Sequence, residues 1–146
     1  MKTTLAALSI SLLGLPAFAG GETPSNPDAT VYFANLADGD TVTSPFTVIF
    51  GLSGMGVAPA GTEKAMTGHH HLLIDRPALG QGEDGADELA YGIASDEQHR
   101  HFGGGQTEVS LELSPGTHTL QLVLGDLGHV PHDTPIVSSV ITVKVE

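Results

Sequence analysis

Eight histidines, all between positions 69 and 132, are the residues of this chain whose type and spacing point to chemistry. Three of them are consecutive, and they run into the apolar, strand-like segment 72–74. Side chains alternate across a strand, so His69 and His71 share one face while His70 lies on the face of the apolar residues that follow. Two imidazoles at this spacing are close enough to share one metal ion, and we predict His69 and His71 as ligands.

Two further pairs of histidines follow along the chain. His99 and His101 have the same two-residue spacing and stand just before Phe102 and three glycines. His129 and His132 flank Pro131, which stiffens the backbone between two donors. The predicted ligand set contains His69, His71, His99 and His101, completed by His129 or His132. A hydrogen-bonded polar network without catalytic meaning is the alternative for each pair.

The two remaining histidines have a simpler interpretation. His118 shares a strand face with three leucines in the segment 117–124, so we predict a histidine at the edge of the core that hydrogen-bonds a neighbour. For His70, packing in the core and metal ligation remain equally open.

The available ligand types limit the range of metals that the chain can bind. The chain has no cysteine, which excludes thiolate zinc sites, iron–sulfur clusters and a blue-copper centre. Imidazole-rich sites suit Cu(II), Zn(II) and Ni(II), and copper has the highest intrinsic affinity of the three. We therefore predict copper, with zinc as the alternative. Met55 and Met66 either add thioether sulfur for Cu(I) or pack in loops. Proton competition near pH 6–6.5 is expected for such a site.

Motifs for catalysis are weak. The chain contains neither the Gly-x-Ser-x-Gly motif of hydrolases nor the His-Glu-x-x-His motif of zinc proteases. The residues favour binding over catalysis. The alternative function is an interaction module that binds a protein or envelope partner without metal and uses its histidines as hydrogen-bonding groups.

The acidic net charge of the chain argues against nucleic acids and anionic membranes as partners. The chain has 17 acidic and 5 basic residues and a formal net charge of -12. Nucleic acids and anionic membrane surfaces are bound by clustered lysine and arginine, which this chain lacks. After the N-terminus, no stretch approaches the roughly 20 apolar residues of a membrane span.

The N-terminus has the pattern of an export signal. Lys2 precedes an apolar run from residue 5 to 15, and Ala17 and Ala19 are the small residues of a cleavage site. We predict a signal peptide over residues 1–19, a flexible linker over 20–29 and a single domain over 30–146. The expected location is the periplasm or the external medium, where a periplasmic protein is a conceivable partner.

Period-two alternation dominates the domain and predicts strands rather than helices. Glycine and proline separate the runs, as at Pro115–Gly116. This pattern predicts an all-β fold, an antiparallel β-sandwich of immunoglobulin-like type. The expected strands cover residues 30–36, 41–53, 70–75, 106–113, 117–124 and 136–145.

One segment departs from the alternation. Residues 77–98 contain four glycines and six acidic residues. We predict a solvated surface loop, because the segment is too long and too polar for a hairpin. The acids lack the ligand spacing of an EF-hand, so calcium is not expected.

Four stretches together resemble a family of short, exported bacterial domains of unknown function. The first is the sequence Gly-His-His-His-Leu-Leu-Ile-Asp at 68–75. The others are residues 101–108, residues 115–122, and Asp126 followed by 129–132. The resemblance implies one exported, β-rich domain that holds the histidine groups in a single unit, and it supplies no reaction. The segment 77–98 lies outside these stretches and is expected to contribute less to the chemistry.

Overall fold

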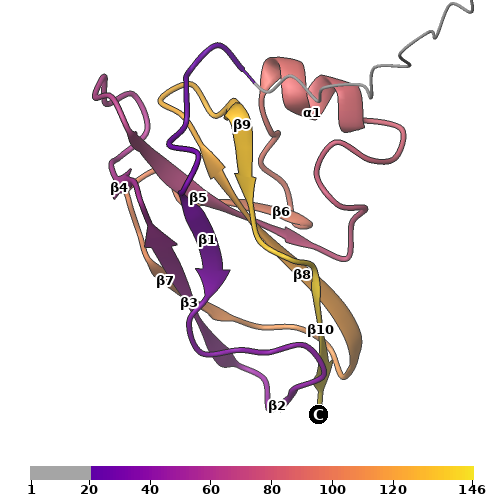
Figure 1. Ribbon diagram of the computed structural model, residues 1–146. Helices are drawn as coiled ribbons and strands as arrows, with labels where there is room; N and C mark the ends of the chain where they lie inside the picture. The colour runs from indigo at the N-terminus through magenta and orange to yellow at the C-terminus, as the bar shows by residue number, and fades with distance from the viewer. Residues whose placement is uncertain (1–20) are drawn as a thin grey trace, which may run out of the picture.

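The computed structural model describes residues 21–146, and these form a β-sandwich with one short helix (Figure 1). The predicted signal peptide and its cleavage site lie outside the described residues. The elements are β1 (Thr30–Phe33), β2 (Thr41–Val42), β3 (Phe46–Ser53), β4 (Gly56–Val57), β5 (Thr67–Ile74), α1 (Gly85–Tyr91), β6 (His99–His101), β7 (Glu108–Leu111), β8 (Gly116–Gly125), β9 (Pro131–Val137) and β10 (Ile141–Val145). The helix is too short to cross a membrane, and the described residues contain no longer one.

Two sheets make the sandwich. The smaller has the order β1-β3-β7, and the larger has the order β2-β10-β8-β5-β4, with β6 beside β5 and β9 beside β8. Most pairs are antiparallel, whereas β2 with β10 and β4 with β5 are parallel. The all-β, antiparallel sandwich predicted from the alternation is confirmed.

Three of the differences from the predicted strand boundaries change the architecture. The expected strand 41–53 is divided by a turn around Pro45, so β2 and β3 join different sheets. The expected strand 136–145 is divided into β9 and β10. Strand β5 begins at Thr67, which places the three histidines inside the strand rather than at its entrance.

The main core lies between the sheets. Leu72, Leu122 and Val48 are fully buried there, and burying each such side chain contributes about 1.5–3 kcal/mol. His70 points into this core, where its ring centroid lies 5.2 Å from that of Phe50. Neither of its nitrogens has a hydrogen-bond partner among the described residues, so His70 packs as an aromatic core residue.

The outer face of the larger sheet is covered too. Residues 77–98 contain α1 and place Ile93 against Leu73 and Val123 in a second, smaller core. The prediction of a purely solvated loop is therefore wrong. Seven helical residues make fewer than two turns, too few to show a helical period in the sequence.

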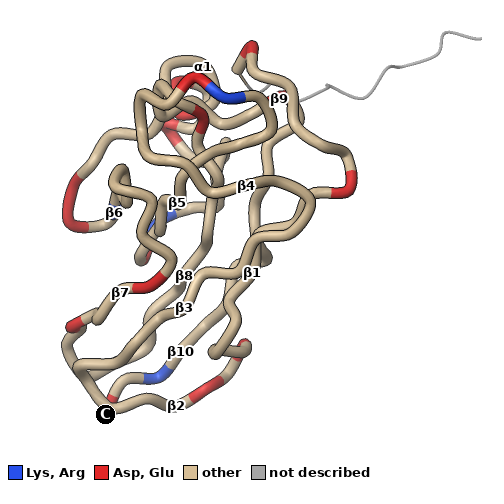
Figure 2. Tube along the Cα trace, turned by 90° about the vertical axis from the view of Figure 1, so that its left-hand side faces the viewer, with Lys and Arg blue, Asp and Glu red and all other residues tan. Residues whose placement is uncertain are grey.

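Ion pairs hold this covering segment to the sheet. Arg76 is the second residue after β5, and its guanidinium donates to the buried carboxylate of Glu88 on α1 at 2.6 Å. Asp96 lies 3.5 Å from the same guanidinium. Acidic residues gather around α1 and are scattered over loops elsewhere, with few basic residues near them (Figure 2). The outer face of β5 and β8 is thus largely covered, and His69 and His71 lie on it.

Candidate metal centre

Strand β5 positions the first two histidines. Its residues from Gly68 to Ile74 are all buried, because the main core covers one face and the segment 77–98 and the loop before β9 cover the other. His69 and His71 lie on the outer face with Leu73, opposite His70. The side-chain alternation expected from the sequence therefore operates within a strand enclosed on both faces.

Strand pairing places a third histidine beside His69 and His71. Strand β6 runs antiparallel to β5 and places His101 directly opposite His71. Paired residues project from the same face of a sheet, so His101 joins His69 and His71 on the outer face. His129 reaches the same place from the loop between β8 and β9.

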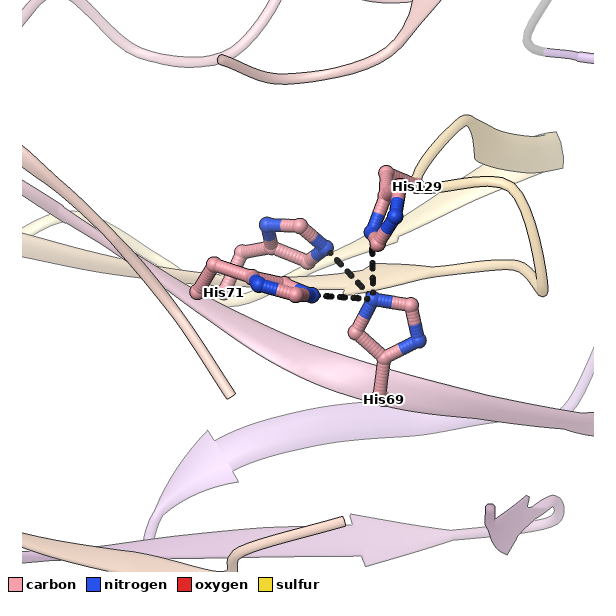
Figure 3. Close-up of side chains that lie close together, drawn as sticks. His69, His71 and His129 are labelled. Atoms are coloured by element: carbon pink, nitrogen blue, oxygen red, sulfur yellow. Dashed lines mark hydrogen bonds between the residues drawn. The ribbon is translucent and has the colours of Figure 1, made fainter. Parts of the chain in front are cut away.

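Four imidazole nitrogens converge in this space. Nε2 of His69 lies 3.1 Å from Nε2 of His71, 3.2 Å from Nε2 of His101 and 3.1 Å from Nδ1 of His129. All four nitrogens lie within 4.8 Å of one another. Figure 3 shows the rings pointing inward to the nitrogen of His69. We call His69, His71, His101 and His129 the histidine cluster.

Hydrogen bonds alone do not account for these contacts. An imidazole nitrogen carries either one proton or one lone pair, so it takes part in one good hydrogen bond. Nε2 of His69 has three nitrogen neighbours at hydrogen-bond distance. At least two of these contacts therefore bring nitrogens together without a shared proton, an arrangement that a cation among the lone pairs would stabilise.

The three contacts made by Nε2 of His69 have the spacing of ligands around a metal ion. Metal–nitrogen bonds of about 2.0–2.1 Å place tetrahedral ligand nitrogens about 3.3 Å apart, and adjacent square-planar ones about 2.9 Å apart. The three contacts to His69, at 3.1–3.2 Å, lie between these values. The donor set contains only imidazoles, which suits late first-row divalent ions.

The cluster is enclosed unevenly. His69 and His71 are fully buried, whereas His101 and His129 are partly exposed. Burial is the main cause that lowers the pKa of His69 to about 4 and that of His71 to about 2, and the neighbouring histidines add to it. Burial also lowers the pKa of His101. These rings are therefore neutral at pH 7 and keep lone pairs free for a metal.

Two glycines give the rings room. A Cβ atom on Gly125, which pairs with His69 across the sheet, would lie 2.6 Å from Nε2 of His71. One on Gly103 would lie 2.3 Å from Cε1 of His101. Gly103 stands in the glycine run noted in the sequence, but the role of Gly125 depends on strand register and has no sequence signal.

Two histidines of the predicted ligand set lie outside the cluster. His99 is fully buried on the same face but pairs with Leu73, and although its ring centroid lies 5.5 Å from that of His71, its nitrogens are not among the converging donors. His132 is fully buried on β9, where its nitrogens lie 3.2 Å from the carbonyl oxygen of Thr67 and 3.4 Å from that of Leu124. The structure thus brings together four of the six predicted residues.

His118 has the hydrogen-bonded role predicted for it. Its Nδ1 lies 2.7 Å from the carboxylate of Asp75, and its Nε2 lies 2.9 Å from the carbonyl oxygen of Ser114. Both partners are acceptors, so both ring nitrogens must donate, and this arrangement favours the charged ring. The hydrogen bond to Asp75 is the main cause that raises the pKa of His118.

We expect an NMR titration of the His118 ring to give a pKa above 6.5. Because the folded state favours the charged ring, its stabilising contribution is fully present below pH 6.5 and disappears as the pH rises through the raised pKa. Asp75→Asn keeps an acceptor for the Thr119 amide but loses the charge, so it should return the His118 pKa toward 6.5. A wild-type pKa at or below 6.5 would contradict this assignment.

Comparisons with known proteins give a family but no activity. The model of a family described as "Domain of unknown function (DUF4399)" matches residues 48–146, a range that contains all eight histidines. No curated protein and no solved structure matches the chain.

Proposed function

The chain belongs to this family of domains of unknown function, and we propose that it is an exported metal-binding module whose histidine cluster holds one ion. The observation that carries the proposal is the convergence of three imidazole nitrogens on Nε2 of His69 at 3.1–3.2 Å. Bringing four rings together in a largely buried space is costly unless something pairs with them. A metal ion removes that cost.

We propose copper as the metal, with zinc as the alternative. Four imidazoles without thiolate or carboxylate accommodate either ion, and the order of intrinsic affinities places Cu(II) above Zn(II). Partial exposure of His101 and His129 leaves a side from which an incoming ligand can reach the ion. This access suits a carrier that takes up and releases its metal, in the periplasm or outside the cell.

Metal titration of the purified, processed protein tests the proposal. Cu(II) and Zn(II) are added separately against a competing chelator, and we expect one equivalent of each to bind, copper more tightly. The double variant His69→Ala/His71→Ala should lose this binding. His101→Ala should weaken it, whereas His99→Ala, which removes a buried histidine two residues away, should not. Wild-type stoichiometry and affinity in both the double variant and His101→Ala would overturn the proposal.

The lowered pKa values predict how binding depends on pH. Histidines with ordinary pKa values lose metal below about pH 6.5, and affinity then falls by up to about tenfold per ligand for each pH unit. Burial and the neighbouring histidines lower the pKa values of His69 and His71 to about 4 and 2, against a smaller opposing effect of the Asp126 carboxylate on His69. Protons therefore compete with metal at these two rings only at lower pH than the sequence suggested.

We expect the metal affinity to fall less between pH 7 and pH 5 than four ordinary histidines would require. Competition titrations at pH 7, 6 and 5 measure this. A model peptide with four histidines serves as the control for ordinary proton competition. A loss of affinity in the protein as steep as in the peptide would contradict the expectation.

A further inference from the structure

Asp126 organises the turn that carries His129. The Asp126 amide donates to the carbonyl oxygen of Val130 at 2.8 Å, and the His129 amide donates to the carbonyl oxygen of Asp126 at 3.1 Å. One carboxylate oxygen, Oδ1, accepts the amides of Gly128 at 2.8 Å and Val130 at 3.0 Å. Asp126 is only 7% exposed. Its backbone and side chain together close the turn from both ends.

The turn holds His129 in a conformation that few residues adopt. His129 has a φ of 71°, in the left-handed region that costs a residue with a side chain free energy. Its amide is held by Asp126, and its carbonyl oxygen accepts the amide of Ile93 from the covering segment at 3.2 Å. Contacts on both sides of His129 therefore fix the position of the turn and of the His129 ring.

The second carboxylate oxygen of Asp126 reaches the N-terminal end of the described chain. The Thr23 hydroxyl donates to Oδ2 at 2.6 Å. Residues 21–25, which we call the N-terminal strap, run beside β9: the Gly21 amide donates to Pro131 at 2.7 Å, and the Asp133 amide donates to Thr23 at 2.9 Å. The strap precedes the part of the chain that the family model matches.

These contacts make a continuous connection from the strap to the candidate metal centre. Thr23 holds one oxygen of Asp126, the other oxygen holds the turn, and the turn places Nδ1 of His129 3.1 Å from Nε2 of His69. The carboxylate of Asp126 is not among the converging donors. Groups that orient metal ligands typically change metal affinity by about 10- to 100-fold when removed, and Asp126 orients His129 through the backbone of its turn.

We propose that Asp126 is the positioning residue for the His129 ligand and that the N-terminal strap, through Thr23, controls how firmly this ligand is held. The inference rests on the proposed metal-binding function. It couples the strap to the candidate metal site, although no strap residue is among the converging donors. Release of the strap then leaves an ion bound by the three ligands from β5 and β6.

Copper titration combined with EPR spectroscopy of the Cu(II) protein tests the inference, since the spectrum reports the nitrogen ligands. Asp126→Ala should lower the affinity for Cu(II) by about 10- to 100-fold, less than the loss of His129 itself, and should shift the spectrum toward that of His129→Ala. Asp126→Asn keeps an amide oxygen to accept the two turn amides, so it should retain the wild-type spectrum. Thr23→Val should weaken binding by about tenfold, and Thr23→Ser should restore it.

The results of these experiments distinguish the positioning role of Asp126 and Thr23 from the metal-binding function. If wild-type protein binds Cu(II) through histidine but Asp126→Ala and Thr23→Val keep its spectrum and affinity, the positioning role is overturned and the metal-binding function stands. If wild-type protein itself shows no histidine-bound copper or zinc, the function fails and the positioning role fails with it. Thermal unfolding of the apoproteins identifies a variant that has lost its fold, and Thr23→Val with Thr23→Ser then decides the question.

Discussion

His69→Leu is expected to abolish tight metal binding while leaving the sandwich folded. His69 is the one residue whose nitrogen lies within 3.2 Å of a nitrogen from each of the other three rings, so its loss removes the centre of the cluster. Removing a hydrogen-bonded partner behind a ligand costs about 10- to 100-fold in affinity, and removing a ligand should cost more than about 100-fold. Leucine fills much of the buried space without adding a polar atom.

Metal-dependent stability measures this loss. An ion present at about 1,000 times its dissociation constant stabilises the folded state by about 4 kcal/mol, and a 100-fold weaker site at the same concentration gives about 1.4 kcal/mol. Metal should therefore raise the free energy of unfolding of wild-type protein by nearly 3 kcal/mol more than that of the variant. The control is His99→Leu, which removes a buried histidine whose nitrogens lack hydrogen-bond partners and are not among the converging donors. An equal metal effect in wild-type protein and His69→Leu would rule out His69 as a ligand.

The fold was largely predictable because its determinants are local. Alternation along residues such as Phe46, Val48 and Phe50 indicates a strand with one buried face, and several such strands with intervening turns indicate a sandwich. The same rule assigned His69 and His71 to one face and His70 to the other. The helix α1 was missed because its seven residues bury only one large apolar side chain, Leu89, which is too few to show a helical period.

The site was less predictable because it depends on pairing between distant strands. His99 and His101 have the same spacing as His69 and His71, but only the register of β6 against β5 decides which of them lies opposite His71. His132 lies one residue beyond Pro131, which pairs with Gly125, so alternation turns its side chain to the other face. Asp126 was visible in the sequence as an acid three residues before His129, but its capping of the turn was not.

The left-handed backbone conformation of His129 allows the effect of this residue on folding to be separated from its effect on metal binding. His129 has a φ of 71°, and glycine adopts this conformation without the cost that a Cβ atom adds. His129→Gly should therefore leave the stability of the apoprotein unchanged or raise it by up to about 1–2 kcal/mol. The same substitution removes one of four converging nitrogens, so the affinity for Cu(II) should fall by more than about 100-fold.

Met66→Gly is the matched control for the backbone effect. Met66 has a φ of 58°, is 44% exposed and precedes β5, so glycine there relieves the same kind of conformation without removing an imidazole. Denaturant unfolding of the apoproteins and Zn(II) titration, in which a thioether is a poor ligand, measure the two effects separately. We expect both variants to be at least as stable as wild-type protein and only His129→Gly to bind zinc weakly. Wild-type zinc affinity in His129→Gly would mean that this strained residue serves the turn alone, because the removal of a ligand must weaken the binding of the ion.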